Sequence, residues 1–238
     1  MIKTETITYE GPGGTYEGTI SYDDSIEGPR PGVLVCHAWM GQGAFETEQA
    51  EKLAALGYVG FALDVYGKGV RASDADRAAE LMNQVASDHS VLLARLEYAL
   101  ELLKEHPLVD GDKTGAIGYC FGGKCVLDLA RSGAATLGVV SFHGILGAPA
   151  GAEEPFINAK VLALHGWDDP LATPEQAREF AEEMTKRGVD WQLHAYGNTV
   201  HAFTLPTAND LDHGICYQPD AARRSWQAME NFLEEVFA

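Results

Sequence analysis

The chain has 238 residues, 46% of them hydrophobic, and a formal net charge of −18 at pH 7. That length can bury the core of one α/β domain, so we expect a single domain spanning residues 1–238. The negative charge argues against binding to nucleic acid or to anionic lipid, because both repel an acidic surface.

The start of the chain, Met1 to Thr6, is polar and lacks the apolar core of a signal peptide. No apolar run approaches the roughly 18 residues that a membrane span needs. We therefore expect a soluble, cytoplasmic protein with no membrane partner. Monomer and homodimer both stay open.

The cysteines do not form a pattern typical of secreted disulfide proteins or of zinc sites, so we expect reduced thiols and no metal. The chain contains four, which are Cys36, Cys120, Cys125 and Cys216.

The first predicted element is a β-hairpin, in which the alternating runs Thr4–Tyr9 and Tyr16–Tyr22 flank a Gly-rich turn. The next run, Val33–His37, is continuously apolar and typical of a parallel strand buried on both faces. Further along, Asp74 is expected to cap a helix and Pro174 to occupy the first position of another. The later elements are predicted as helix 45–56, strand 59–63, two helices within 73–103, strand 114–118, helix 122–131, strand 137–142, a loop at 147–154, strand 161–165, helix 174–187, strand 191–196 and helix 220–237.

Repeated β-α units after a leading hairpin predict an α/β fold, with a mostly parallel central sheet flanked by helices. In such sheets the functional site lies at the carboxyl ends of the strands. Candidate site residues are therefore those that follow predicted strand ends, namely Ala38, Trp39, Cys120, His143, Asp168, Asp169 and His201.

The segment Gly118–Gly123 follows a predicted strand and opens a predicted helix. It matches the nucleophile elbow Gly-x-Ser-x-Gly, with Cys120 in place of serine. The sharp turn strains the backbone at the nucleophile and requires small neighbours, which Gly118 and Gly122 provide. The start of the following helix favours a thiolate at Cys120. A buried, inert cysteine beside a glycine turn is the alternative.

Elbow enzymes follow the chain order nucleophile, acid, histidine. Here a predicted strand ends at Asp168-Asp169, and His201 lies in the loop after the next strand. Each residue also has a non-catalytic alternative, since Asp169 could cap a turn before Pro170 and His201 could be a surface residue. The three in this order at three strand ends favour a catalytic triad.

With these motifs the sequence resembles the dienelactone hydrolase family, whose members have the α/β-hydrolase fold. The resemblance covers nearly the whole chain and is carried by four segments, which are His37–Gly41, Gly118–Gly123, His165–Pro170 and His201–Phe203. It implies that Cys120 is the nucleophile, His201 the base and Asp169 the carboxylate that orients the base. Asp169 is preferred over Asp168 because it directly precedes Pro170.

Two departures from the family pattern bear on the substrate. Family members usually carry a glutamate at the position of Ala38, and the dienelactone-cleaving members carry an arginine at the position of Leu205. The first departure puts the family's way of activating the thiol in doubt. The second makes dienelactone itself a poor fit, so we expect an uncharged, ester-like small molecule.

The backbone N–H groups of Phe121 and Trp39 are the expected oxyanion donors. Substrate contact and ordinary core packing both remain open for the residues that flank the motifs, which are Ala38, Trp39, Tyr119, Trp167 and Phe203.

Three functions remain open. The first is hydrolysis of a carboxylic ester or lactone through a covalent thioester. The second is hydrolysis of a neutral phosphotriester by the same triad, which the space beside Ala38 would favour. The third is a catalytically inactive binding protein that has kept the fold. A redox role for Cys120 lacks a resolving partner, because Cys125 lies on the following helix and is expected to face away.

Other signals are set aside. Gly67–Ala72 matches the Gly-x-Gly-x-x-Ala dinucleotide pattern but does not follow the first β-strand, and Lys68 and Arg71 suggest an exposed loop, so no cofactor is expected. For His143 a hydrogen-bonded structural role is favoured over pocket lining. The acidic pairs Asp23-Asp24 and Glu153-Glu154 are taken as solvated surface charge.

Overall fold

The computed structural model describes residues 1–149 and 156–238. The chain divides into two compact units, Met1–Ile117 and Gly118–Ala238. The single domain expected from chain length stays a prediction. The charge predicted at Glu153 and Glu154, and most of the predicted loop at 147–154, lie outside the described residues.

The first unit begins with the predicted hairpin. Strands β1 (Ile2–Gly11) and β2 (Gly14–Asp23) pair antiparallel, and Gly11 lies opposite Gly14. Strand β2 also pairs antiparallel with β4 (Val59–Ala62), and β4 pairs parallel with β3 (Arg30–Cys36). The order in this unit is therefore β1-β2-β4-β3.

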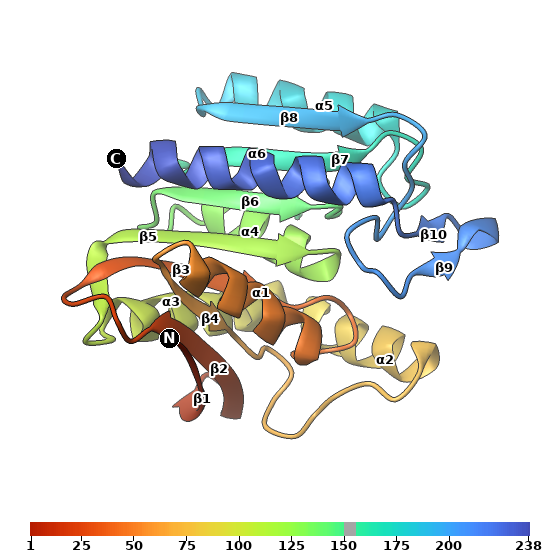
Figure 1. The fold of residues 1–238 in the computed structure, drawn as a ribbon. Helices are drawn as coiled ribbons and strands as arrows, with labels where there is room; N and C mark the ends of the chain where they lie inside the picture. Colours follow the sequence, from red (N-terminus) through yellow and green to blue (C-terminus); the bar gives the residue numbers. More distant parts are fainter. Residues whose placement is uncertain (150–155) are drawn as a thin grey trace. The chain divides into compact units, whose positions relative to one another are not determined.

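Three helices complete the first unit. Helix α1 (Ala44–Ala55) contacts β3 and β4, and a Cβ on Gly60 would lie 2.6 Å from the carbonyl oxygen of Ala50, so only glycine allows α1 this close. Helices α2 (Ala75–Ala86) and α3 (His89–Lys104) contact each other, and α3 also packs on β3. In Figure 1, α1 lies in front of these strands and α3 behind them.

Strand β5 (Val109–Tyr119) leads the chain from the first unit into the second. In the second unit β6 (Gly138–Phe142), β7 (Lys160–Gly166) and β8 (Trp191–Tyr196) pair in parallel, in that order. Nearly every residue of β6 and β7 is buried, as expected for strands covered on both faces.

Helices cover both faces of the strands of the second unit. Helix α4 (Phe121–Arg131) packs on β6, and α5 (Pro174–Lys186) packs on β8. The long C-terminal helix α6 (Pro219–Phe237) contacts β6 and β7 and lies in front of them in Figure 1, with α4 and α5 behind. The predicted α/β-hydrolase fold, mostly parallel strands flanked by helices after an N-terminal hairpin, is thus confirmed.

A short segment of secondary structure between β8 and α6 was not predicted. It consists of β9 (Asn209–Asp210), the 3₁₀ turn η1 (Leu211–His213) and β10 (Ile215–Cys216), with β9 and β10 paired antiparallel. Two-residue strands leave no periodic pattern in a sequence, so pattern analysis could not find them.

The predicted caps also form. Asp74 caps α2 by accepting a hydrogen bond from the backbone N–H of Arg77, and Pro174 occupies the first turn of α5. Within the described residues, no helix is both long and apolar enough to cross a membrane.

Candidate active site

The predicted nucleophile elbow forms at the junction of β5 and α4. Cys120 has φ 54° and ψ −114°, in a region that non-glycine residues rarely occupy, and α4 begins at the next residue, Phe121. The turn is held by the Cys120 N–H, which donates to the Phe142 carbonyl at 3.0 Å, and by the Cys120 carbonyl, which accepts from the Lys124 N–H at 3.2 Å. The half-buried thiol is thereby fixed at the N-terminus of α4.

The glycines around the elbow allow the backbone segments to approach closely. A Cβ on Gly118 would collide with the carbonyl group of Gly122, which is rigid backbone. A Cβ on Gly123 would lie 2.8 Å from the Cα of Gly144, in the loop after β6. The small residues of the motif are therefore needed for the turn and for the packing of α4 against that loop.

Asp169 lies just after β7 and is buried, with 1% of its surface exposed. Its Oδ1 accepts hydrogen bonds from the backbone N–H groups of Leu171 (2.8 Å) and Ala172 (3.3 Å). Its Oδ2 lies 2.8 Å from Nδ1 of His201, which donates to it. The neighbouring Asp168 is exposed. Of the two carboxylates, Asp169 is thus the one that contacts the histidine.

His201 is also buried, and its pKa is shifted strongly. Burial alone would lower this pKa, but the hydrogen bond to Asp169 and the interaction with the Cys120 thiol raise it to about 10. The other ring nitrogen, Nε2, is buried and has no hydrogen-bond partner among the described residues. Cys120, Asp169 and His201 therefore interact within one unit, with the imidazolium favoured beside the thiol.

The unpredicted small strands hold the backbone of His201. The His201 N–H donates to the Gly214 carbonyl at 2.9 Å, and the His201 carbonyl accepts from the Cys216 N–H at 3.0 Å. These two bonds form a parallel bridge between His201 and Ile215. The position of His201 is therefore set by a segment 13 to 15 residues later in the chain.

His143 lies beside His201 at the end of β6. The two imidazole rings meet edge to face with their centroids 5.1 Å apart. His143 Nε2 forms a 2.7 Å hydrogen bond with Oγ1 of Thr204, but Nδ1 is buried with no partner among the described residues. A structural role with both ring nitrogens hydrogen-bonded was predicted for this histidine, and only one of the two nitrogens has a partner. Its contact with His201 was not predicted, because no sequence pattern indicates it.

The predicted substrate-contacting aromatics of the second unit differ in exposure. Tyr119 and Phe203 are buried, and Trp167 is 44% exposed. Tyr119 stacks on Phe142 with ring centroids 4.6 Å apart, and Phe203 packs edge to face on His143 at 5.1 Å. Substrate contact by these residues stays a prediction, and core packing accounts for Tyr119 and Phe203.

The other predicted site residues, Ala38 and Trp39, lie in the first unit and are half-buried. The Trp39 carbonyl accepts a 2.8 Å hydrogen bond from the Tyr66 hydroxyl. The buried carboxylate of Glu46 accepts from the N–H groups of Ala38 (3.2 Å) and Gly43 (3.0 Å), and burial raises its pKa. The loop that carries Trp39 is thus held at three points.

Arg71 corrects the prediction of a purely exposed loop at 67–72. Its guanidinium donates to the Val70 carbonyl (2.7 Å) and to Oε1 of Gln42 (2.9 Å), and it lies 3.5 Å from the buried Asp64 carboxylate. Lys68 is exposed, as expected. Arg71 therefore ties this loop to the one that begins at Ala38.

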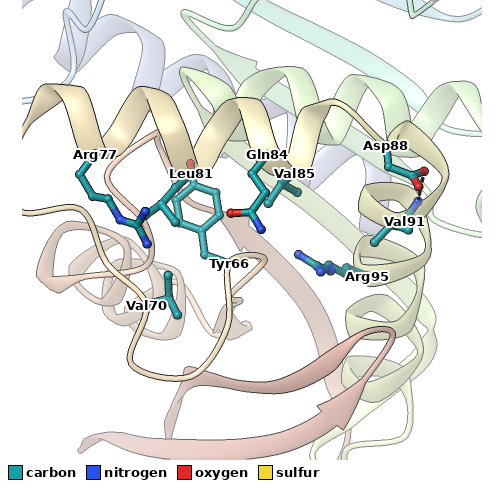
Figure 2. A pocket seen from close by; sticks show the side chains of 9 residues that line it. All are labelled: Tyr66, Val70, Arg77, Leu81, Gln84, Val85, Asp88, Val91 and Arg95. Carbon is teal, nitrogen blue, oxygen red and sulfur yellow. Dashed lines mark hydrogen bonds between the residues drawn. The ribbon is translucent and has the colours of Figure 1, made fainter.

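A cavity of about 340 Å³ lies in the first unit, beneath α2 and beside the first turns of α3 (Figure 2). Its lining is mixed, with three charged side chains among apolar ones, and includes Arg77, Asp88, Arg95, Tyr66 and Leu81. No residue predicted to contact substrate lines it. In the part of the chain that the structure describes, no group of three or more histidine, cysteine or acidic side chains is arranged to hold a metal ion.

Residues 18–237 match the family model described as the dienelactone hydrolase family. The fold is similar to the crystal structure of a dienelactone hydrolase-like promiscuous phosphotriesterase from metagenomic libraries, with 36% identity, a TM-score of 0.93 and coverage of 100% of this chain and 99% of that one. An uncharacterized protein of Caenorhabditis elegans is 38% identical over 62% of this chain and 95% of its own length. A protein of Aquifex aeolicus with the provisional name carboxymethylenebutenolidase is 28% identical over 86% of this chain and 87% of its own.

Proposed function

The chain belongs to the dienelactone hydrolase family of ester- and lactone-cleaving enzymes, and we propose that it hydrolyses an uncharged ester or lactone through Cys120, His201 and Asp169. The observation that carries this proposal is the buried Asp169–His201 hydrogen bond of 2.8 Å, whose histidine interacts with a thiol at a strained elbow. An inactive binding protein would have no need to keep a strained cysteine beside a buried, oriented histidine.

In the first half of the proposed reaction, the Cys120 thiolate attacks the carbonyl carbon of the substrate. A C–S bond forms and the C–O bond to the leaving group breaks. His201, as imidazolium, gives its Nε2 proton to the departing alkoxide, and Asp169 keeps the opposite nitrogen protonated. The Phe121 N–H, at the start of α4, is the proposed oxyanion donor of the second unit. The second donor predicted from the sequence, the Trp39 N–H, lies in the first unit and stays a prediction.

In the second half, water releases the acyl group. Once Cys120 is acylated, its negative charge is gone, so one of the interactions that raise the pKa of His201 is lost. The neutral imidazole then takes a proton from water as the hydroxide oxygen bonds to the thioester carbon. The C–S bond breaks, the carboxylic acid leaves, and the thiolate–imidazolium pair is restored.

Phosphotriester hydrolysis is the second candidate function. It is favoured by the similarity to a promiscuous phosphotriesterase at 36% identity over the whole chain. Alanine at position 38, where the family usually has glutamate, also favours a bulky tetrahedral substrate, because the alanine side chain is small. In this reaction the thiolate would attack phosphorus, and the aryl oxide would leave with the proton of His201. Water, deprotonated by His201, would then attack phosphorus, break the P–S bond and release the phosphodiester.

The test compares the wild type with Cys120→Ala and Cys120→Ser on p-nitrophenyl acetate and on a neutral aryl phosphotriester. The proposal expects turnover by the wild type alone, and the ratio of kcat/KM between the two substrates assigns the preferred class. Cys125→Ala serves as the control, since this buried thiol on α4 has no proposed role. Full activity in Cys120→Ala would refute the mechanism. Inactivity of the wild type on both substrates would favour the binding protein.

A further inference from the structure

His143 occupies an unusual position for a residue outside the proposed triad. Its φ of 39° places it in the left-handed region, which residues other than glycine adopt infrequently. Its N–H donates to the Leu164 carbonyl at 2.8 Å, which anchors the backbone to β7. Only 2% of its surface is exposed. A residue keeps such a backbone conformation only where the surrounding structure holds it there.

The side chain of His143 links β6 to the loop that carries His201. Its Nε2 bonds to Oγ1 of Thr204 at 2.7 Å, three residues beyond His201. Its ring packs edge to face on His201 and on Phe203, with both pairs of centroids 5.1 Å apart. One rigid ring therefore contacts both ends of the turn 201–204.

We propose that His143 is a positioning residue for His201, fixed by Thr204 so that its ring holds the His201 imidazole at the angle that joins Asp169 to Cys120. The inference rests on the proposed function, because it assigns a task to the base of that mechanism. It goes beyond it by adding a residue pair, His143 and Thr204, that touches neither substrate nor nucleophile in the proposed reaction.

The electrostatics of the cluster agree with this role. Burial, and the repulsion from His201, keep the pKa of His143 well below its usual value, so the ring stays neutral beside the imidazolium. The groups that interact electrostatically with His201 are Asp169, Cys120, His143 and His165, and burial also lowers the pKa of His165. The neutral His143 ring orients His201 by packing against it and does not compete with Asp169 for the proton of His201.

The test uses two nearly isosteric changes, His143→Phe and Thr204→Val, and the double variant. His143→Phe keeps a ring but removes the hydrogen bond, and Thr204→Val removes the hydroxyl that fixes the ring. We expect kcat on p-nitrophenyl acetate to fall about tenfold in His143→Phe, with KM within about twofold, because small displacements of a catalytic group slow the chemical step. Thr204→Val should lose about threefold. The double variant should match His143→Phe, because the two side chains act as one unit.

A second measurement reports on the interaction between His201 and the Cys120 thiol in a reaction that forms no oxyanion. The rate at which iodoacetamide alkylates Cys120 at pH 7 depends on the thiolate that His201 stabilises, so it should fall severalfold in His143→Phe. Thr207→Val, an exposed threonine in the same loop, and His194→Phe, on β8, are the controls and should behave as the wild type. Thermal melts monitor folding. If His143→Phe does not fold, the kcat and alkylation rate of Thr204→Val test the positioning role.

The outcomes separate this inference from the proposed function. Wild-type kcat and alkylation rates in Thr204→Val and in folded His143→Phe would overturn the positioning role, even where Cys120→Ala is inactive. Additive losses in the double variant would overturn the claim that the two residues act as one unit. Full activity of Cys120→Ala would instead remove the mechanism on which the inference rests.

Discussion

Asp169 and His201 are joined by a buried 2.8 Å hydrogen bond, and Asp169 uses its other oxygen to accept two backbone N–H groups. Both oxygens of the carboxylate are therefore occupied. The backbone N–H groups fix the orientation of the carboxylate. The carboxylate in turn keeps Nδ1 of His201 protonated, and Nε2 is directed away from Asp169. This arrangement prepares His201 for proton transfer at Nε2.

Replacing Asp169 by asparagine should lower kcat/KM by about 10²- to 10⁴-fold, because the amide can present its NH₂ group to Nδ1 and stabilise the wrong tautomer. Steady-state kinetics on p-nitrophenyl acetate measure the loss. Asp168→Asn is the matched control, since that carboxylate is exposed and should retain activity. Equal losses in both variants would assign the effect to surface charge and contradict the role of Asp169.

The raised pKa of His201 predicts the pH dependence of thiol reactivity. Because this pKa is about 10, the imidazolium should persist beside Cys120 through neutral pH, and its loss should appear only as the pH approaches 10. In Asp169→Asn, which removes one of the raising interactions, that transition should move to lower pH. The measurement is the second-order rate of Cys120 alkylation from pH 6 to 11. An unchanged transition in Asp169→Asn would contradict the assignment.

The same shift predicts a change in stability. A histidine whose pKa is higher in the folded than in the unfolded protein stabilises the fold fully below about 6.5, its unfolded value. That contribution is lost as the pH rises from there through about 10. The free energy of unfolding from urea titrations should therefore decline over this range more steeply in the wild type than in His201→Gln. Parallel curves would show that His201 is not charged in the folded state.

Gly118→Ala should prevent the elbow from forming, because its Cβ would collide with the backbone of Gly122, which cannot move without unwinding the start of α4. Overpacking against rigid backbone costs about 3 kcal/mol or more. Urea unfolding measures the loss. Gly197→Ala, with open space at its Cβ, is the control and should stay within about 1 kcal/mol of the wild type. A fully stable, active Gly118→Ala would show that the turn is not as tight as described.

Gly214→Ala tests whether the small strands hold His201. This residue has a positive φ of 70°, and an added Cβ would collide with the ring of Pro170, directly after Asp169. Its carbonyl also accepts the His201 N–H. We expect kcat to fall about tenfold or more through displacement of His201. Gly188→Ala has a similar φ of 67° but open space, so it carries the strain without the collision and should remain active.

The sequence predicted much of the fold and the residues of the candidate site because these depend on local patterns. The glycines around Cys120 predicted the turn, since only small residues allow β5 to meet α4 so closely. The alternation of strands and helices predicted the parallel strands and their helical cover. Asp169 was chosen over Asp168 from its place before Pro170, and the hydrogen bond to His201 agrees with that choice.

What the sequence did not reveal depends on contacts between distant segments. His143 reaches His201 and Thr204 only because β6 ends beside the loop after β8. Glu46 was not singled out because, in the sequence, it is one acidic residue on a helix among several. In the structure its carboxylate accepts two N–H groups of the loop that carries Trp39. Such roles appear only once the chain is folded.

The most direct test of the central claim is to trap the covalent intermediate. Wild-type protein mixed with excess p-nitrophenyl acetate and quenched in acid within the first turnover should gain the mass of one acetyl group, and peptide mapping should place it on Cys120. His201→Gln should accumulate less of the adduct. An acetyl group on another residue, or none at any time during turnover, would contradict the account.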